Sequence, residues 1–374
     1  RWTSRENPGR QENRMKIEAA VIKGDGVGPE MMEGAVLVLK KICSVFDHEL
    51  NLHPVVACGQ AIDAGLPPLP KDSLQVCQSL PAVLFGNSGL KKYQEFPLEK
   101  RPEGALMQLR RGMKVTTNLR PVKYYPQLAG FSPLKKEILE KGLDIVFVRD
   151  IAGGVLCSDQ VKGQGDFGSE AYEYEYYNEK IVEDTAEIAF WLAGRRKKQV
   201  SSLDKANVLA SSRLWRQCVE RTGKKHPDIG LEHLYIDNAA MKILEAPWRF
   251  DVIVTANLFG DIISDEGTQI TGTPYLFASA ELNQERRGIY TPNQLHYPEE
   301  RDGGKGIVNP TGMILAAALM LRYTFSLEEE ARAAEQAVWQ VIQEGKATRD
   351  IWQAGKTLLS TMEMAEEIAG KIGL

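Results

Sequence analysis

Residues 257–265 read N-L-F-G-D-I-I-S-D and follow an apolar, strand-like run over residues 250–255. The stretch carries two carboxylates, Asp261 and Asp265, at a spacing that places both on one face of a helix, about one turn apart. Two such acids repel each other unless a cation lies between them, and oxygen ligands of this kind suit Mg²⁺ or Mn²⁺. A second interpretation is a helix start, where acidic side chains interact favourably with the positive end of the helix dipole.

The composition of the chain argues against several classes of protein. Its 374 residues allow two domains, and a net charge of −4 gives no basic surface for nucleic acid. No apolar run approaches the roughly 20 residues that cross a bilayer, so we expect no membrane partner. The five cysteines are scattered without a C-x-x-C pair, which indicates a reducing compartment and a cytoplasmic location. Residues 1–14 are polar and lack the apolar core of a signal peptide, so we expect a disordered extension or tag before a native start at Met15.

Strand-like and helical segments alternate along the chain, which predicts an α/β fold. A strand over residues 17–22 leads through a turn over 24–29 (G-D-G-V-G-P) into a helix with proline at its first position. The turn differs from the dinucleotide fingerprint, and its glycines permit either close approach of a ligand or a tight strand-to-helix connection. Residues 157–177 are rich in Gly, Gln and Tyr and alternate like an exposed hairpin, which would suit a dimer arm.

Charged side chains stand at the ends of several predicted elements. Arg110, Arg120 and Arg149 together would bind a di- or tricarboxylate by forked hydrogen bonds, although each alone is typical of a structural ion pair. Lys205 follows a strand and would serve as a proton donor or acceptor, or would simply lie on the surface. Asp237, at the end of a strand predicted over residues 233–237, is either a helix N-cap or a third metal carboxylate.

Eight motifs, in this order along the chain, resemble those of the β-decarboxylating dehydrogenases, the family of isocitrate, 3-isopropylmalate, homoisocitrate and tartrate dehydrogenases. The motifs are residues 23–30 (K-G-D-G-V-G-P-E), 101–110 (R-P-E-G-A-L-M-Q-L-R), 118–122 (N-L-R-P-V), Val148-Arg149, 204–207 (D-K-A-N), 235–237 (Y-I-D), 257–265 and 305–310 (K-G-I-V-N-P). Each motif alone is weakly specific, whereas all eight in the family order are specific. The resemblance extends from about Met15 to the C-terminus.

The resemblance implies an isopropylmalate dehydrogenase-like α/β fold of two domains with a shared mixed sheet, distinct from a standard Rossmann fold. Residues 15–115 and 272–374 would form the cofactor-side domain. Residues 116–271 would form the second domain, with the dimer interface and the arm near residues 157–177. The resemblance also implies a homodimer whose subunits share their active sites, so that Lys205 and Asp237 serve the site of the neighbouring subunit.

The resemblance implies a metal- and NAD(P)-dependent oxidative decarboxylation of a small 2-hydroxy diacid of the malate type. Lys205 and Asp237 would be catalytic, and Asp237 would join Asp261 and Asp265 at a Mg²⁺ or Mn²⁺ ion. The implied substrate-binding residues are Glu103, Leu106, Met107, Arg110, Arg120 and Arg149. The implied cofactor contacts are Asn257, His296, Glu299 and Asn309.

The helix before Arg110 indicates the substituent on the substrate. Leu106 and Met107 would form an apolar wall for an alkyl group, where isocitrate enzymes place a polar Ser and Asn, although both could be ordinary helix core. We therefore expect 3-isopropylmalate, an intermediate of leucine biosynthesis, or a related 3-alkylmalate. Tartrate, D-malate or isocitrate are the alternatives.

Three segments depart from the family pattern. Leu156 occupies the position of a tyrosine that helps to protonate the enolate, so Tyr172, Tyr174 or Tyr176 would have to replace it. The adenine-ribose loop is longer and carries Thr291 in place of a glutamate; its acidic residues favour NAD over NADP without excluding the latter. The segment 271–275 lacks the usual closing glycine. Because of these departures, a catalytically impaired regulatory paralogue is the alternative function from another class.

Overall fold

The computed structural model describes residues 14–293 and 302–373, and these divide into two compact units. We call Thr116–Gly272 the central unit, and we call residues 14–115 together with 273–293 and 302–373 the terminal unit. The extension expected over residues 1–14 lies outside this description except for Arg14. Among the described residues, every helix is too short or too polar to traverse a lipid bilayer.

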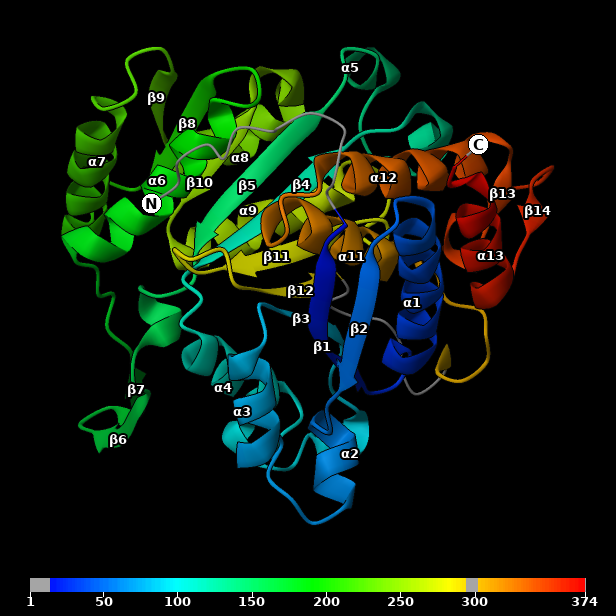
Figure 1. The fold of residues 1–374 in the computed structure, drawn as a ribbon. Helices are drawn as coiled ribbons and strands as arrows, with labels where there is room; N and C mark the ends of the chain where they lie inside the picture. The colour runs from blue at the N-terminus through cyan, green and yellow to red at the C-terminus, as the bar shows by residue number, and fades with distance from the viewer. Residues whose placement is uncertain (1–13, 294–301, 374) are drawn as a thin grey trace. The chain divides into compact units, whose positions relative to one another are not determined.

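The sheet of the terminal unit has the strand order β2-β1-β3-β12-β11 (Figure 1). Its neighbouring strands run parallel except for β11 and β12, which run antiparallel, so the sheet is mixed. The strands are β1 Lys16–Gly24, β2 Glu49–Pro54, β3 Ala82–Asn87, β11 Ala278–Leu282 and β12 Gly288–Pro292, with a small pair of β13 Lys346–Ala347 and β14 Thr357–Leu358.

Helices α1, α11, α12 and α13 of the terminal unit pack against one another, and α1 and α11 also contact the sheet. The sequence of α11 is apolar on all sides, as a helix enclosed by other elements requires, and nearly all of its side chains are buried. The helices of this unit are α1 Gly28–Val45, α2 Cys58–Asp63, α3 Lys71–Ser79, α4 Glu103–Met113, α11 Thr311–Tyr323, α12 Glu328–Gln343 and α13 Thr361–Lys371.

The sheet of the central unit has the strand order β4-β5-β10-β8-β9, with β4 antiparallel to β5 and the remaining neighbours parallel. The strands are β4 Thr117–Lys123, β5 Asp144–Asp150, β8 Gln199–Asp204, β9 Gly230–Tyr235 and β10 Val252–Thr255. The helices are α5 Lys136–Leu139, α6 Glu179–Ala193, α7 Ala210–Gly223, α8 Ile236–Glu245 and α9 Asn257–Gln269. The α/β class and the mixed sheet predicted from the sequence are confirmed.

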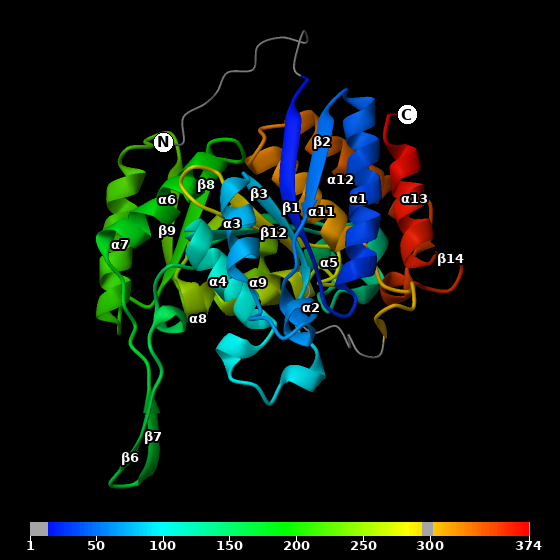
Figure 2. The same cartoon turned by 60° about the horizontal axis from the view of Figure 1, so that its bottom comes forward.

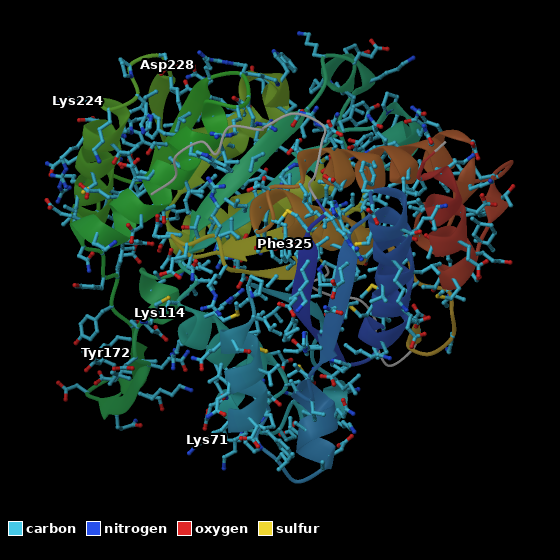
Figure 3. The ribbon with its side chains drawn as sticks, viewed as in Figure 1. Lys71, Lys114, Tyr172, Lys224, Asp228 and Phe325 are labelled. Atoms are coloured by element: carbon cyan, nitrogen blue, oxygen red, sulfur yellow. The ribbon has the colours of Figure 1, made fainter. Side chains whose placement is uncertain are left out.

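The hairpin expected within residues 157–177 is present as β6 Val161–Gly165 paired antiparallel with β7 Gly168–Tyr172. Figure 2 shows it projecting from the rest of the central unit, and Tyr172 at its end is labelled in Figure 3. Tyr174 and Tyr176 follow the hairpin and are exposed, whereas Tyr177 is buried. The alternation in the sequence therefore identified the hairpin, but the tyrosine run extends beyond it.

The parallel strands of the central unit place several candidate residues along one edge of its sheet. The register aligns Arg149 of β5 with Thr255 of β10, and Thr255 with Leu203 of β8. The carboxyl ends of parallel strands lie at the same edge of a sheet, which is where ligands bind in open α/β folds. The residues that leave β5, β10, β8 and β9 thus emerge together.

Candidate active site

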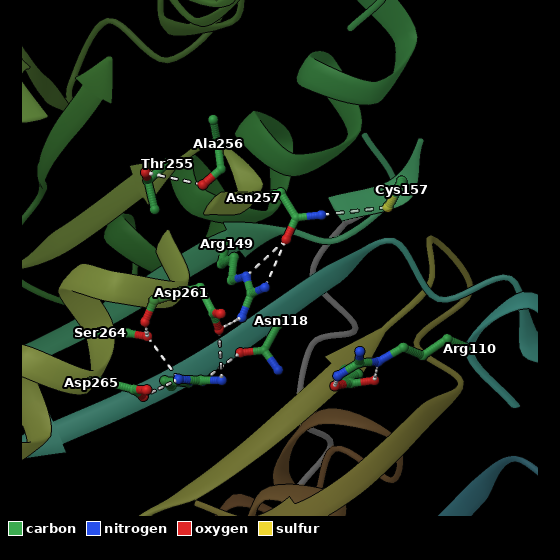
Figure 4. A network of polar contacts seen from close by, with 12 residues as sticks. Arg110, Asn118, Arg149, Cys157, Thr255, Ala256, Asn257, Asp261, Ser264 and Asp265 are labelled. Carbon is green, nitrogen blue, oxygen red and sulfur yellow. Dashed lines mark hydrogen bonds and ion pairs between the residues drawn. The ribbon is translucent and has the colours of Figure 1, made fainter. Parts of the chain in front are cut away.

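Arg149 is the centre of the candidate site in the central unit (Figure 4). It ends β5, is 7% exposed, and directs its guanidinium at the first two turns of α9. Nε and Nη2 donate to Oδ1 of Asn257 at 3.0 and 2.8 Å, and Nη1 forms an ion pair with Asp261. A Cβ at Gly260 would lie 2.7 Å from Cγ of Arg149, so the glycine of the N-L-F-G-D motif allows this side chain to cross the helix.

Arg120 of β4 forms a second ion pair with the same helix. Its Nη1 donates to Oδ1 of Asp265 at 2.6 Å and to Oγ of Ser264 at 2.8 Å, and Nη2 lies 3.8 Å from Oδ1 of Asp261. Asn118 accepts from Nε at 3.2 Å and completes the set of partners (Figure 4). A buried guanidinium requires such partners because an unpaired charge in the interior is strongly unfavourable.

Asp261 and Asp265 lie in the second and third turns of α9, whose first turn has no acidic residue. The helix-start interpretation of these acids is therefore wrong, because the dipole effect fades within the first turn. Their side chains are 40% and 42% exposed, so carboxylate oxygens stay accessible although each pairs with an arginine. Burial and the neighbouring charge of Asp261 raise the pKa of Asp265 against the opposing effect of Arg120.

Two accessible carboxylates on one helix face fit a hard divalent cation in the type of donor atom, but two acids alone are few for such an ion. Within residues 14–293 and 302–373 of one chain, no group of three or more His, Cys, Asp or Glu side chains could hold a metal ion. The structure does not bring Asp237 of the same chain into one group with Asp261 and Asp265.

Lys205 and Asp237 form a separate pair at the ends of β8 and β9. Nζ of Lys205 lies 2.9 Å from Oδ2 of Asp237, and their side chains are 27% and 65% exposed. The hydrogen bond from Lys205 lowers the pKa of Asp237. Asp237 lies in the first turn of α8, and Tyr235 occupies the N-cap position, so the N-cap interpretation of Asp237 is wrong.

Behind Asn257 lies a buried pair that the motifs did not indicate. The hydroxyl oxygen of Tyr177 accepts the backbone N–H of Asn257 at 2.8 Å, and Tyr177 also hydrogen-bonds to Asp150. Burial raises the pKa of Asp150 from 3.8 to about 6, although the N–H groups of Ala152 and Gly153 donate to it at 3.0 and 2.8 Å. Local sequence gave no signal for this pair because Tyr177 closes a run of otherwise exposed tyrosines.

In the terminal unit, Arg110 of α4 is paired with Glu281 of β11, and its Nε donates to Oε2 at 2.8 Å. Leu106 and Met107 on the same helix are only half-buried, unlike the fully buried Leu109. The helix-core interpretation of these two side chains therefore does not account for their exposure. Glu103 lies exposed in the first turn of α4.

The glycine turn between β1 and α1 is filled by the protein itself. Gly24 has φ of +75°, and a Cβ there would lie 1.8 Å from the carbonyl oxygen of Asn87. A Cβ at Gly28 would lie 2.4 Å from the carbonyl oxygen of Lys23. These glycines therefore permit close approach of β1 to β3 and of the start of α1 to the end of β1, as in the tight-connection interpretation.

The predicted cofactor contacts are described only in part. His296 and Glu299 lie outside the described residues. Asn309 is fully buried; its Nδ2 donates to Asp350 at 3.0 Å and its Oδ1 accepts from Thr311. Leu156, in place of the family tyrosine, is exposed in the middle of a short 3₁₀ turn, Val155–Cys157.

Comparison with known proteins agrees with the arrangement of motifs. A family model described as isocitrate/isopropylmalate dehydrogenase matches residues 18–368. The 3-isopropylmalate dehydrogenase of Mannheimia succiniciproducens is 45% identical over 94% of this chain and 98% of its own length. That of Clostridium acetobutylicum is 41% identical over 96% and 99%. A crystal structure of isocitrate dehydrogenase from Methylococcus capsulatus matches with a TM-score of 0.82 and 26% identity, over 96% of this chain and all of that one.

The substitution Asp150→Asn tests the burial of this carboxyl group. Because its pKa is raised to about 6, the folded protein binds the proton more tightly than the unfolded chain. The contribution of Asp150 to the free energy of unfolding is therefore largest below pH 4 and falls as pH rises through 6. Relative to Asp150→Asn, the wild type should lose on the order of 3 kcal/mol between pH 4 and 7, measured by urea denaturation.

Asp228→Asn is the matched control, because Asp228 is exposed (Figure 3) and its hydrogen bond from Lys198 lowers its pKa. Because the pKa of Asp228 lies below the ordinary value of an aspartate, this variant should follow the wild-type curve between pH 5 and 8. Parallel curves for wild type and Asp150→Asn would show that the buried carboxyl group titrates normally.

Proposed function

Because the chain belongs to the isocitrate/isopropylmalate dehydrogenase family, whose members are NAD(P)-dependent β-decarboxylating dehydrogenases, we propose that it acts on a malate-type diacid with an alkyl substituent. The preferred substrate in this proposal is 3-isopropylmalate, as in leucine biosynthesis. The observation that carries it is the half-buried pair of Leu106 and Met107, one turn before Arg110 on α4. The names of the Mannheimia and Clostridium relatives agree with this choice.

We assign the substrate carboxylates to the three arginines. Arg149 and Arg120 are supported by their burial and by forked donor groups, which match the planar geometry of a carboxylate. Arg110 presents the same chemistry from α4, and its side chain is about one-third exposed. Glu103 and the apolar pair Leu106 and Met107 are assigned to the remainder of the substrate.

We assign a Mg²⁺ or Mn²⁺ ion to Asp261 and Asp265, with Asp237 of a second subunit as the third carboxylate. A cation bound there would polarise the oxygen on the carbon that is oxidised, so that the resulting keto group could accept the electron pair left when the neighbouring carbon loses its carboxylate as CO₂. Nζ of Lys205 is assigned to the proton of the 2-hydroxyl group, and Asp237, 2.9 Å away, fixes its position. Leu156 has no exchangeable proton, so the final protonation uses another group or water.

We propose NAD as the cofactor on the basis of the acidic residues in the loop that includes Glu299. Together with His296, this residue is outside the described part of the chain. Asn309 and Asn257 are the described members of the proposed set, and both have buried side chains engaged within the protein. We therefore propose that the backbone around these two residues, and not their side chains, contacts the cofactor.

We propose a homodimer formed through α8 and α9 of the central unit, with the β6-β7 hairpin as an arm. These two packed helices leave large apolar side chains exposed, namely Met241, Leu244, Leu258 and Ile262. Phe167 at the tip of the hairpin is also fully exposed. Exposed large apolar side chains on two packed helices are typical of an interface, and a second copy presents the same side chains.

Analytical ultracentrifugation at micromolar concentration should give a particle of about twice the 41.7 kDa chain mass. Met241→Asp combined with Ile262→Asp should yield monomers without turnover, because the interface and the shared sites are lost together. Leu66→Asp changes an exposed leucine of the terminal unit and should remain dimeric. A wild type that sediments as a monomer would contradict the shared-site proposal.

The function is tested by a grid of diacids and cofactors, followed by absorbance of the reduced nicotinamide. We expect the highest kcat/KM with 3-isopropylmalate and NAD, lower values with D-malate, tartrate and isocitrate, and no turnover after metal removal with EDTA until Mg²⁺ or Mn²⁺ is restored. Metal-dependent binding of diacids without turnover would instead identify the impaired paralogue, for which Leu156 is the favouring observation.

The same activity assay tests the metal assignment. Asp261→Asn should raise the Mg²⁺ concentration for half-maximal activity by at least about 10-fold, because one charged oxygen ligand becomes neutral. Asp228→Asn, an exposed aspartate of the same unit, should leave this concentration unchanged. Equal metal requirements for the wild type and Asp261→Asn would remove Asp261 from the site.

The apolar wall is tested by Leu106→Ala. This substitution removes three side-chain carbon atoms that would contact the alkyl group. It should lower kcat/KM for 3-isopropylmalate roughly 50-fold and kcat/KM for D-malate by less than about threefold. Leu66→Ala, at an exposed position of the same unit, should change neither value. Equal losses for both substrates would show that Leu106 supports the helix and does not contact the alkyl group.

A further inference from the structure

We propose that Tyr177 and Asp150 are positioning residues that fix Asn257, and through Asn257 set the guanidinium of Arg149 for a substrate carboxylate. The inference rests on the proposed function, because it assigns Arg149 to substrate binding. Neither Tyr177 nor Asp150 would contact the substrate. Their effect would pass through two hydrogen-bonded residues.

Asn257 is held on both sides. On the inner side, its backbone N–H donates to the Tyr177 hydroxyl oxygen at 2.8 Å, and its Nδ2 donates to the carbonyl oxygen of Gly153 at 2.8 Å. On the outer side, its Oδ1 accepts both Nε and Nη2 of Arg149. The amide therefore has a fixed orientation, and it presents a fixed acceptor to the arginine.

The hydroxyl of Tyr177 has one defined arrangement. Asp150 is ionised above its raised pKa and has only acceptor atoms, so the Tyr177 hydroxyl donates to it and accepts from Asn257. The ring packs edge-on against Trp215, with centroids 5.6 Å apart. A Cβ at Gly153 would lie 2.7 Å from the ring, so the glycines after Asp150 let the loop fold over it.

The pair is costly for folding, which argues for a role at the site. Asp150 is fully buried, and its raised pKa means that ionisation near neutral pH opposes folding. A buried polar network of this kind is often neutral in stability compared with an apolar replacement, but it fixes one geometry. Asp150 directly follows Arg149 in the chain. Strand β5 therefore supplies both the arginine and, in Asp150, part of the pair that holds Asn257, the partner of that arginine.

The test is Tyr177→Phe, which keeps the ring packing and removes only the hydroxyl. Calorimetric binding of malonate, a simple dicarboxylate, to the metal-free protein should weaken about 10-fold, because a buried N–H loses its acceptor and Asn257 loosens. KM for the diacid should rise by a similar factor, while kcat changes less than about threefold. The matched control is Tyr93→Phe, since Tyr93 is also buried and donates to an aspartate, Asp63, at 2.8 Å.

A double-mutant cycle separates positioning from general support of the fold. Asn257→Ala keeps the backbone N–H but removes the contact with Arg149, so adding Tyr177→Phe to it should weaken malonate binding no further. Additive losses, or unchanged binding by Tyr177→Phe, would overturn the inference. If Tyr177→Phe fails to fold, Asp150→Asn replaces it in the same cycle. Malonate binding needs no turnover, so a wild type inactive in the diacid grid would contradict the proposed function and leave this test intact.

Discussion

The burial of two guanidinium groups is the constraint on which the central unit depends. Arg120 and Arg149 are 6% and 7% exposed, and each would be strongly destabilising without an anion. Helix α9 supplies those anions from Asp261 and Asp265, whose spacing of one turn matches two arginines on antiparallel neighbours β4 and β5. The orientation of α9 against this sheet is therefore set by charge pairing as well as by its buried apolar face.

The same pairing makes the cluster suitable for ligands. Two arginines and two aspartates sum to zero charge, so a divalent cation and a dicarboxylate entering together leave the total unchanged. The carboxylates are already about two-fifths exposed, whereas the guanidinium groups are enclosed. A cation would thus meet accessible oxygens, while a substrate carboxylate would meet donors held in place by Asn257, Asn118 and Ser264. Preorganised donors of this kind lower the ordering cost of binding.

Sequence patterns predicted the elements of the fold and much of the candidate cluster. The strands predicted over residues 17–22 and 250–255 correspond to β1 and β10, and the i, i+4 spacing correctly placed Asp261 and Asp265 on one helix face. The patterns failed where the partner is distant in sequence. Nothing local links Asp150 with Tyr177. The helix-start interpretation of the α9 acids failed because periodicity identifies a face and leaves the first residue of a helix undefined, and Asp237 was misplaced by the same uncertainty at α8.

The charged groups of the site do not all carry the same weight as evidence for catalysis. Arg149, Arg120 and their aspartates would be needed for folding alone, because removing one partner leaves a buried charge unpaired. Lys205 and Asp237 are different: their pair is partly exposed, and such ion pairs contribute little to stability. Folding therefore does not explain why this chain carries Lys205 and Asp237. Proton transfer beside a bound cation, the role proposed for Lys205 and Asp237, would explain them, so this exposed pair supports that proposal more strongly than the buried cluster does.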